Sequence, residues 1–209
     1  MRELAERVFA VGVQHWDRRL FDELIPLPDG TSYNAYLVKG SEKTALLDTA
    51  DPAKTHELID HLVQAGADKI DYVVSHHAEQ DHSGSIPDVL LMYPDAKVVT
   101  NPKCKEMLIH HLRLEDEQFV TVEDGEKLSL GDKTLQFIYT PWVHWPETMS
   151  TWLAEDRILF SCDFFGSHKT SNRLYVEDEW EVYEAAKRYF AEIMMPFRSA
   201  IRGNLKKLE

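Results

Sequence analysis

The sequence predicts a mixed fold of the α/β or α+β class. Short apolar segments typical of strands alternate with segments whose apolar residues recur at helical spacing. Clusters of histidine and acidic residues follow several predicted strands, and α/β folds often build their sites at strand ends. With 209 residues, of which 44% are hydrophobic, the chain can form one substantial core. Because no repeat, low-complexity tract or Ser/Gly linker divides it, we expect residues 1–209 to form a single domain.

The N-terminal half is predicted to alternate strands and helices after an initial loop. The loop is assigned to residues 26–34, where Pro26 and Gly30 favour turns. The helix at 54–66 rests on helical spacing of its apolar residues and ends at Gly66, a residue type suited to terminate a helix. The predicted strands are 33–40, 43–49, 69–77 and 96–100, and the predicted helices are 54–66, 85–94 and 102–112.

The C-terminal half is predicted to contain hairpins followed by helices. A strand at 119–122 precedes two strand–turn–strand segments, 126–141 and 150–163. An aromatic-rich amphipathic helix is expected over 177–195. Pro196 should break this helix, because proline lacks the backbone N–H that helical hydrogen bonding requires. A last helical segment closes the chain.

Charge, hydropathy and cysteine content exclude several classes of function. The formal net charge of −13, without a basic patch, disfavours binding to nucleic acid. No apolar run approaches the roughly 20 residues of a membrane span, and Glu3, Glu6 and Arg7 interrupt any signal-peptide core. Cys104 and Cys162 form no CxxC pair, so we expect two reduced thiols in a cytoplasmic protein. Cys162 is expected to be a small buried residue and not a nucleophile.

A metal site is predicted in one turn, SHHAEQDHSGSIPD, which directly follows a buried strand. His77, Glu79 and Asp81 alternate, as they would on an extended segment that points them one way, and His82 follows. Imidazoles and carboxylates together suit a first-row transition ion such as Fe, Mn or Zn. The alternative is an exposed polar turn, but so many ionisable groups are costly to hold together without a cation. Gly84 would let the chain turn sharply into the next helix.

Further ligands are expected from loops elsewhere in the chain. His144 follows a predicted strand and lies between Trp142 and Trp145. Asp163 ends the apolar run ILFSC, where solubility does not explain an acidic side chain, and its two oxygens could bridge two cations. His168 follows closely as a candidate substitute ligand. The alternatives are a histidine packed between indoles and a carboxylate that caps a turn.

The chain resembles the diiron domain of flavodiiron proteins, a branch of the metallo-β-lactamase superfamily. Four blocks match that family in order and spacing: GTSYNAYLV, HAEQDHSGS, TPWVHWPETM and LFSCDFFGSH. The resemblance implies an αββα sandwich with two metal ions at one edge. The glutamate in HxExDH distinguishes this branch from zinc hydrolases, which carry HxHxDH.

The resemblance also implies a ligand set and an activity. It implies two iron ions, joined through an oxo or hydroxo bridge, with these ligands: His77, Glu79 and His144 for one, Asp81 and His82 for the other, and Asp163 between them. Zn or Mn could substitute for Fe. Members of the family reduce O2 to water, NO to nitrous oxide, or both.

The chain departs from the family pattern in three places. No histidine follows His168, whereas the family supplies a further histidine to the second iron after its last helices, so the domain looks short at its C-terminus. Water, His168, a neighbouring chain or a downstream segment could fill that position. We expect the chain to lack the FMN-carrying flavodoxin domain of the family, so electrons would come from a separate flavodoxin- or rubredoxin-like protein. Asp22 stands where the family often has a histidine near the pocket.

The sequence leaves three other functions open: an oxygen-binding or sensing protein without turnover, a zinc-dependent hydrolase, and a metal-poor fragment. Glu79, in place of a histidine, disfavours the hydrolase. A homodimer is compatible with the family, although one reason for pairing is lost without the flavin domain.

The remaining histidines of interest have ordinary interpretations. His76 is expected to point away from the metals. His56, His61, His110 and His111 are expected to be solvated on the surfaces of helices.

Overall fold

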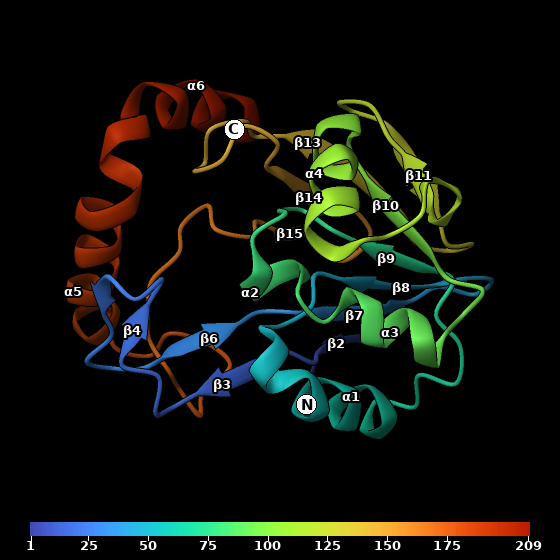
Figure 1. Cartoon of the computed structure of the whole chain (residues 1–209), viewed down its shortest axis with the longest axis horizontal. Helices are drawn as coiled ribbons and strands as arrows, with labels where there is room; N and C mark the ends of the chain where they lie inside the picture. Colours follow the sequence, from blue (N-terminus) through green and yellow to red (C-terminus); the bar gives the residue numbers. More distant parts are fainter.

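The computed structural model describes residues 1–209 and contains two sheets packed face to face (Figure 1). The strands of the larger sheet, in spatial order, are β1 (Arg2–Ala5), β2 (Val8–Ala10), β7 (Tyr36–Lys39), β8 (Thr44–Leu47), β9 (Tyr72–Val74), β10 (Lys97–Thr100) and β11 (Phe119–Thr121). Those of the smaller sheet are β12 (Lys127–Ser129), β13 (Thr134–Tyr139), β14 (Met149–Leu153) and β15 (Ile158–Phe160).

Helices complete the layers. The outer face of the larger sheet is covered by α1 (Thr55–Gln64), α3 (Ile86–Met92) and α4 (Pro102–Leu112). A C-terminal pair, α5 (Glu179–Tyr189) and α6 (Arg198–Leu208), lies beside the sheets, and α6 is tied to the end of β13 by Asn204 Nδ2, which donates to Pro141 O at 2.9 Å. The predicted αββα sandwich is confirmed. None of these helices combines the length and the apolarity that crossing a bilayer requires.

The central strands are apolar on both faces because both faces are buried. In β8, Leu46 packs towards the helices and Leu47 into the core between the sheets. In β9, Val73 and Val74 divide in the same way, as the two-residue period of a strand requires. This double burial explains why these strands appear in the sequence as continuous apolar runs.

The strands β8, β9, β10 and β11 run parallel to one another. Their carboxyl ends therefore meet at one edge of the larger sheet. Asp48 follows β8 at this edge, and His76 and His77 follow β9. The topology thus brings the predicted metal-binding turn to a sheet edge, where it can meet loops from the smaller sheet.

The N-terminal strands differ from the prediction. The strand β3 (Val13–His15) pairs with β6 (Thr31–Tyr33), and β4 (Leu20–Phe21) pairs with β5 (Ile25–Pro26). Residues 26–34 are therefore only partly a loop. Strands of two or three residues show too little alternation to be recognised in a sequence.

The helix expected over 177–195 is also shorter than predicted. Asp178 caps its start by accepting a hydrogen bond from the Trp180 backbone, and α5 gives way after Tyr189 to a π-helical turn, Phe190–Met194. The predicted break at Pro196 is confirmed, because this residue lies in a single 3-10 turn between α5 and α6.

Two local predictions about the metal-binding turn are wrong. The segment is not extended throughout, because Gln80–Ser83 form one helical turn, α2. Gly84 has an ordinary helical φ of −62° and makes no sharp turn. Its role is close packing, since a Cβ there would lie 2.5 Å from Pro52 Cδ.

Gly84→Ala is expected to lower the free energy of unfolding by about 1–3 kcal/mol, because the added methyl group overpacks the contact with Pro52. The matched control is Gly203→Ala in α6, where a Cβ meets nothing within 4 Å. That change should stabilise the protein by about 0.5–1 kcal/mol, because alanine favours helix more than glycine does. Urea denaturation of the metal-free proteins measures both effects. Equal stability of Gly84→Ala and the unchanged protein would contradict this packing argument.

Candidate metal centre

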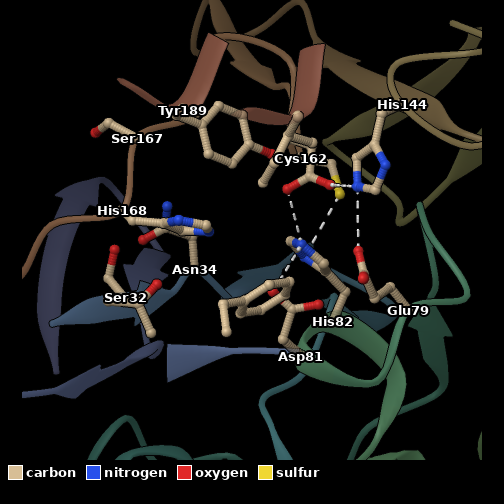
Figure 2. A pocket seen from close by; sticks show the side chains of 15 residues that line it. Ser32, Asn34, Glu79, Asp81, His82, His144, Cys162, Ser167, His168 and Tyr189 are labelled. Carbon is tan, nitrogen blue, oxygen red and sulfur yellow. Dashed lines mark hydrogen bonds and ion pairs between the residues drawn. The ribbon is translucent and has the colours of Figure 1, made fainter. Parts of the chain in front are cut away.

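The predicted ligands come from four separate places in the fold and converge: all but His77 line one pocket (Figure 2), and His77 is grouped with Glu79, His144 and Asp163. His77 and Glu79 follow β9, and the helical turn α2 carries Asp81 and His82. The other two come from the smaller sheet: His144 lies in the loop between β13 and β14, and Asp163 follows β15. Residues separated by up to 86 positions, from 77 to 163, are therefore brought together by the facing of the two sheets.

The first group of ligand atoms is compact. Glu79 Oε2 lies 3.2 Å from His77 Nε2 and 3.1 Å from His144 Nε2. Asp163 Oδ2 lies 3.5 Å from His77 Nε2 and 3.4 Å from His144 Nε2. The potential ligand atoms of these four residues all lie within 4.8 Å of one another, which suits a single cation.

The second group uses the other oxygen of the same carboxylate. Asp163 Oδ1 lies 3.0 Å from His82 Nε2, and Asp81 Oδ2 lies 3.5 Å from the same nitrogen. Asp81 Oδ1 is buried and has no hydrogen-bond partner. Because the two oxygens of Asp163 face different groups, its carboxylate has the orientation of a bridge between two cations.

Without a metal ion, protonated histidines balance the negative charge of the carboxylates in this cluster. Burial alone would lower the pKa of His77, but hydrogen bonds to Glu147 and Glu79 raise it to about 10. Burial alone would also lower the pKa of His144, but hydrogen bonds to Asp163 and Glu79 raise it to about 9. At Glu79, burial would raise the pKa, but His144 and His77 lower it to about 2. Carboxylates and imidazoles that hold charge this strongly without exposure to solvent form a site suited to cations.

The donor set fits two first-row metal ions. Burial raises the pKa of Asp81 to about 7, and the nearby carboxylates Glu79 and Asp163 raise it further, although His82 acts in the opposite direction. A cation would stabilise the ionised carboxylate and also satisfy Asp81 Oδ1. The ligand types, three imidazoles and three carboxylates, match borderline ions such as Fe, Mn and Zn.

His168 lies beside these groups but belongs to neither. Its ring packs between Phe21 and Tyr189, with centroid distances of 5.0 and 4.9 Å. Burial lowers the pKa of His168 to about 4, so the imidazole is neutral at pH 7. The residue lines the same pocket as Asp81 and Asp163, which keeps it a candidate for the position that the family fills with a further histidine.

A second set of potential ligand atoms, from Asp48, His82 and Cys162, also lies within 4.8 Å. Asp48 is already occupied, since its two oxygens lie 2.8 Å from the His76 backbone nitrogen and 2.7 Å from His76 Nδ1. We therefore assign no separate ion to this set. Cys162 Sγ lies 3.5 Å from His82 Nδ1, and burial raises the pKa of the thiol well above its usual value.

The other histidines largely follow the prediction. His76 turns away from the ligand pocket, because its ring nitrogens are bonded to Asp48 and to Thr151. His56, His110 and His111 are exposed on α1 and α4. His61 is an exception: it is half-buried, and its Nδ1 lies 3.0 Å from Val11 O.

Asp22 lies near the candidate ligand Glu79, in a groove separate from the pocket between the ligands. It lines a groove of about 500 Å³ together with Glu79, His111 and Trp145. Partial burial, together with the negative charge of Glu79, raises the pKa of Asp22. A carboxyl group, and not an imidazole, therefore stands against the ligand Glu79 on this side.

The pocket between the ligands is small. Its volume is about 50 Å³, enough for one or two water-sized molecules. Phe21, Tyr189 and Ile193 contribute apolar side chains to its lining. The size of the pocket therefore suits small ligands.

Sequence reasoning missed two buried carboxylates that support the ligands. Glu147 Oε1 accepts a hydrogen bond from His77 Nδ1 at 2.7 Å, and Asp48 holds the loop through His76. Glu147 belongs to the block TPWVHWPETM, and its place two residues after Trp145 in an apolar segment was the only available signal.

Comparison with known proteins is consistent with this geometry. A family described as ODP family beta lactamase matches residues 31–209. A type A flavoprotein, fprA, from Rhodobacter capsulatus is 39% identical over 99% of this chain and 48% of its own length. An anaerobic nitric oxide reductase flavorubredoxin from Pectobacterium atrosepticum is 35% identical over 95% of this chain and 40% of its own length.

Solved structures give the same result. The flavodiiron protein from Giardia intestinalis has a TM-score of 0.92 and 33% identity, covering 98% of this chain and 50% of that one. Rubredoxin oxygen:oxidoreductase from Desulfovibrio gigas has a TM-score of 0.94 and 31% identity, covering 99% and 52%. This chain thus spans about half the length of the relatives that it matches, or less.

An αββα sandwich with imidazoles and carboxylates converging at one edge defines a metallo-β-lactamase-like domain. The chain belongs to the ODP family of beta-lactamase-like proteins, and it corresponds to the metallo-β-lactamase-like part of flavodiiron proteins.

Proposed function

We propose that this chain holds a non-haem diiron pair and reduces O2 to water, NO to nitrous oxide, or both. The observation that carries the proposal is the orientation of Asp163, whose two oxygens face two different groups of ligand atoms. Relatives named for oxygen and for nitric oxide chemistry support the same substrates.

The proposed ligand assignment follows the distances. His77, Glu79 and His144 hold one iron, Asp81 and His82 hold the other, and Asp163 bridges them; this set is supported by the contacts of 3.0 to 3.5 Å described above. His168 is the candidate substitute ligand at the second iron. Zn or Mn would fit the same donors.

When bound, two ferrous ions would supply electrons and Lewis acidity to a small ligand. The chain contributes the rest. Its carboxylates keep the two cation positions close, and its histidines point their Nε2 atoms at them. Phe21 and Tyr189 exclude water from one side of the pocket, which strengthens every electrostatic interaction inside it.

We propose that this chain does not itself bind FMN. Electrons would then come from a separate flavodoxin- or rubredoxin-like protein. The name of the Desulfovibrio relative, a rubredoxin oxygen:oxidoreductase, supports a donor of this kind. We further propose that residues 1–209 act as one metal-binding unit and can pair as a homodimer. A cytoplasmic location is favoured by two unpaired cysteines.

Protein produced with iron under anaerobic conditions tests the proposal. Metal analysis should give two irons per chain, and Mössbauer spectroscopy should show a coupled pair. With reduced rubredoxin or flavodoxin, an electrode should record continuous consumption of O2 or NO. His77→Ala should abolish this consumption, whereas His56→Ala, which changes an exposed histidine, should not.

Other outcomes would point elsewhere. One stable adduct per diiron pair, without continued consumption, would identify an oxygen-binding or sensing protein. Zinc-dependent hydrolysis of a model ester that is lost in His77→Ala would identify a hydrolase. Either result would overturn the proposed reductase activity.

A further inference from the structure

Glu147 is a buried carboxylate that the proposed ligand set does not use. Its side chain is fully buried. Oε1 accepts hydrogen bonds from His77 Nδ1 at 2.7 Å and from the Ala78 backbone at 3.0 Å. Oε2 has no partner. Asn101 Nδ2 donates to the Glu147 backbone carbonyl, so the residue is also held by the N-cap of α4.

The hydrogen bond to Glu147 fixes the state of the His77 ring. An ionised carboxylate can only accept, so Nδ1 must carry the proton. Nε2, the other nitrogen, faces the position between Glu79 and Asp163, where a metal ion would displace its proton and bind it. A carboxylate acceptor also makes the imidazole a stronger electron donor towards a bound metal.

His82, on the other side of Asp163, has a much weaker outer partner. Its Nδ1 lies 3.5 Å from Cys162 Sγ. A cysteine sulfur is a weak hydrogen-bond acceptor, and this contact is longer than the 2.7 Å between His77 Nδ1 and Glu147. The two histidines therefore differ in their outer hydrogen bonds although both present Nε2 to Asp163.

We propose that Glu147 is a positioning residue that makes the two metal positions unequal: its charge strengthens His77 as a ligand and lowers the reduction potential of the iron held there, while the iron held by His82 keeps the higher potential. The effect on the reduction potential rests on the proposed diiron function. The effect on the strength of His77 as a ligand applies to any divalent ion that His77 binds.

Glu147→Gln isolates the charge, because glutamine has the same size and can still accept a hydrogen bond from Nδ1. Glu106→Gln is the matched control, since Glu106 is exposed on α4 and its loss changes the net charge equally. Glu147→Asp retains the charge on a shorter side chain and should restore part of the effect. Circular dichroism of the metal-free variants checks folding, and the Asp variant carries the test if the Gln variant is unfolded.

The first measurement titrates the full chain with Co(II) against a competing chelator. In Glu147→Gln, affinity for one of the two ions should fall about 10- to 100-fold, the usual effect of removing such a partner from a ligand histidine. The affinity for the other ion should stay unchanged, and Glu106→Gln should behave like the unchanged protein. Unaltered Co(II) binding in Glu147→Gln would overturn the proposal.

The second measurement is a potentiometric titration of iron-loaded protein followed by EPR and Mössbauer spectroscopy. The potential of one iron should rise in Glu147→Gln and recover partly in Glu147→Asp. An equal rise at both irons would refute unequal tuning. If the unchanged protein binds two Co(II) ions but forms no coupled iron pair, the diiron function fails, and the Co(II) data alone decide the role of Glu147.

Discussion

Asp163→Ala is expected to remove both metal ions from the protein, and not merely to weaken one of them. Asp163 Oδ2 faces His77 and His144, and Oδ1 faces His82. Its loss takes one negative ligand from each cation position. It also removes the shield between two positive ions that would otherwise repel each other across a short distance.

A substitution at a residue that would bind only one of the two ions serves as the comparison for Asp163→Ala. His144→Ala removes a ligand from the first group only, so one ion should be retained. Asp88→Ala, which changes an exposed aspartate on α3, should keep both. Iron or Co(II) analysis after gel filtration gives the number of bound ions. Two ions retained in Asp163→Ala would show that the carboxylate does not bridge.

Metal affinity is expected to rise about 100-fold per pH unit between pH 7 and about pH 9. In the metal-free protein the pKa values of His77 and His144 are about 10 and about 9, so both rings are protonated at pH 7. The pKa of Glu79 is about 2, so this ligand is already ionised. A metal must therefore displace about two protons, and each proton contributes about a factor of ten per pH unit.

Metal affinity is expected to rise with pH because the pKa values of both histidines are raised. Because the histidine pKa values are raised, proton competition is strongest at low pH and disappears as the pH passes about 9 to 10. Co(II) binding in weakly buffered solution with a pH indicator should release about two protons per His77–His144 position at pH 7. His144→Ala, which is expected to lose the ion of this position, should lose this proton release as well. Affinity independent of pH between 7 and 9 would contradict the charge state of the cluster.

The sequence alone predicted elements whose signals are local. The helix 102–112 has the expected bounds because Pro102 occupies its first turn and Asn101 caps it through the Cys104 backbone. The strands β9 and β10 were recognised because burial on both faces makes them continuously apolar. Short N-terminal strands such as β4 and β5 exist only through their partners, and no local pattern marks them.

The candidate ligand residues were recognisable in the sequence because histidines and acidic residues cluster there unusually. The structure brings them together, with five of the six in one pocket and His77 grouped with Glu79, His144 and Asp163. Their local geometry could not be predicted. The alternation from His77 to Asp81 suggested an extended segment, yet the chain turns into α2 because the Glu79 carbonyl accepts hydrogen bonds from the His82 and Ser83 backbones.

The sequence by itself therefore determined the mixed α/β class and the candidate metal-binding side chains, since hydrophobic period and ligand chemistry are properties of single segments, whereas the αββα arrangement followed from the resemblance to flavodiiron proteins. Only the tertiary structure decided how these side chains are coupled. It aimed one oxygen of Asp163 at each group, gave His77 a carboxylate partner in Glu147, and left His82 with the thiol of Cys162. These contacts join residues 70 to 86 positions apart, and their geometry depends on the packing of two sheets, which no single segment encodes.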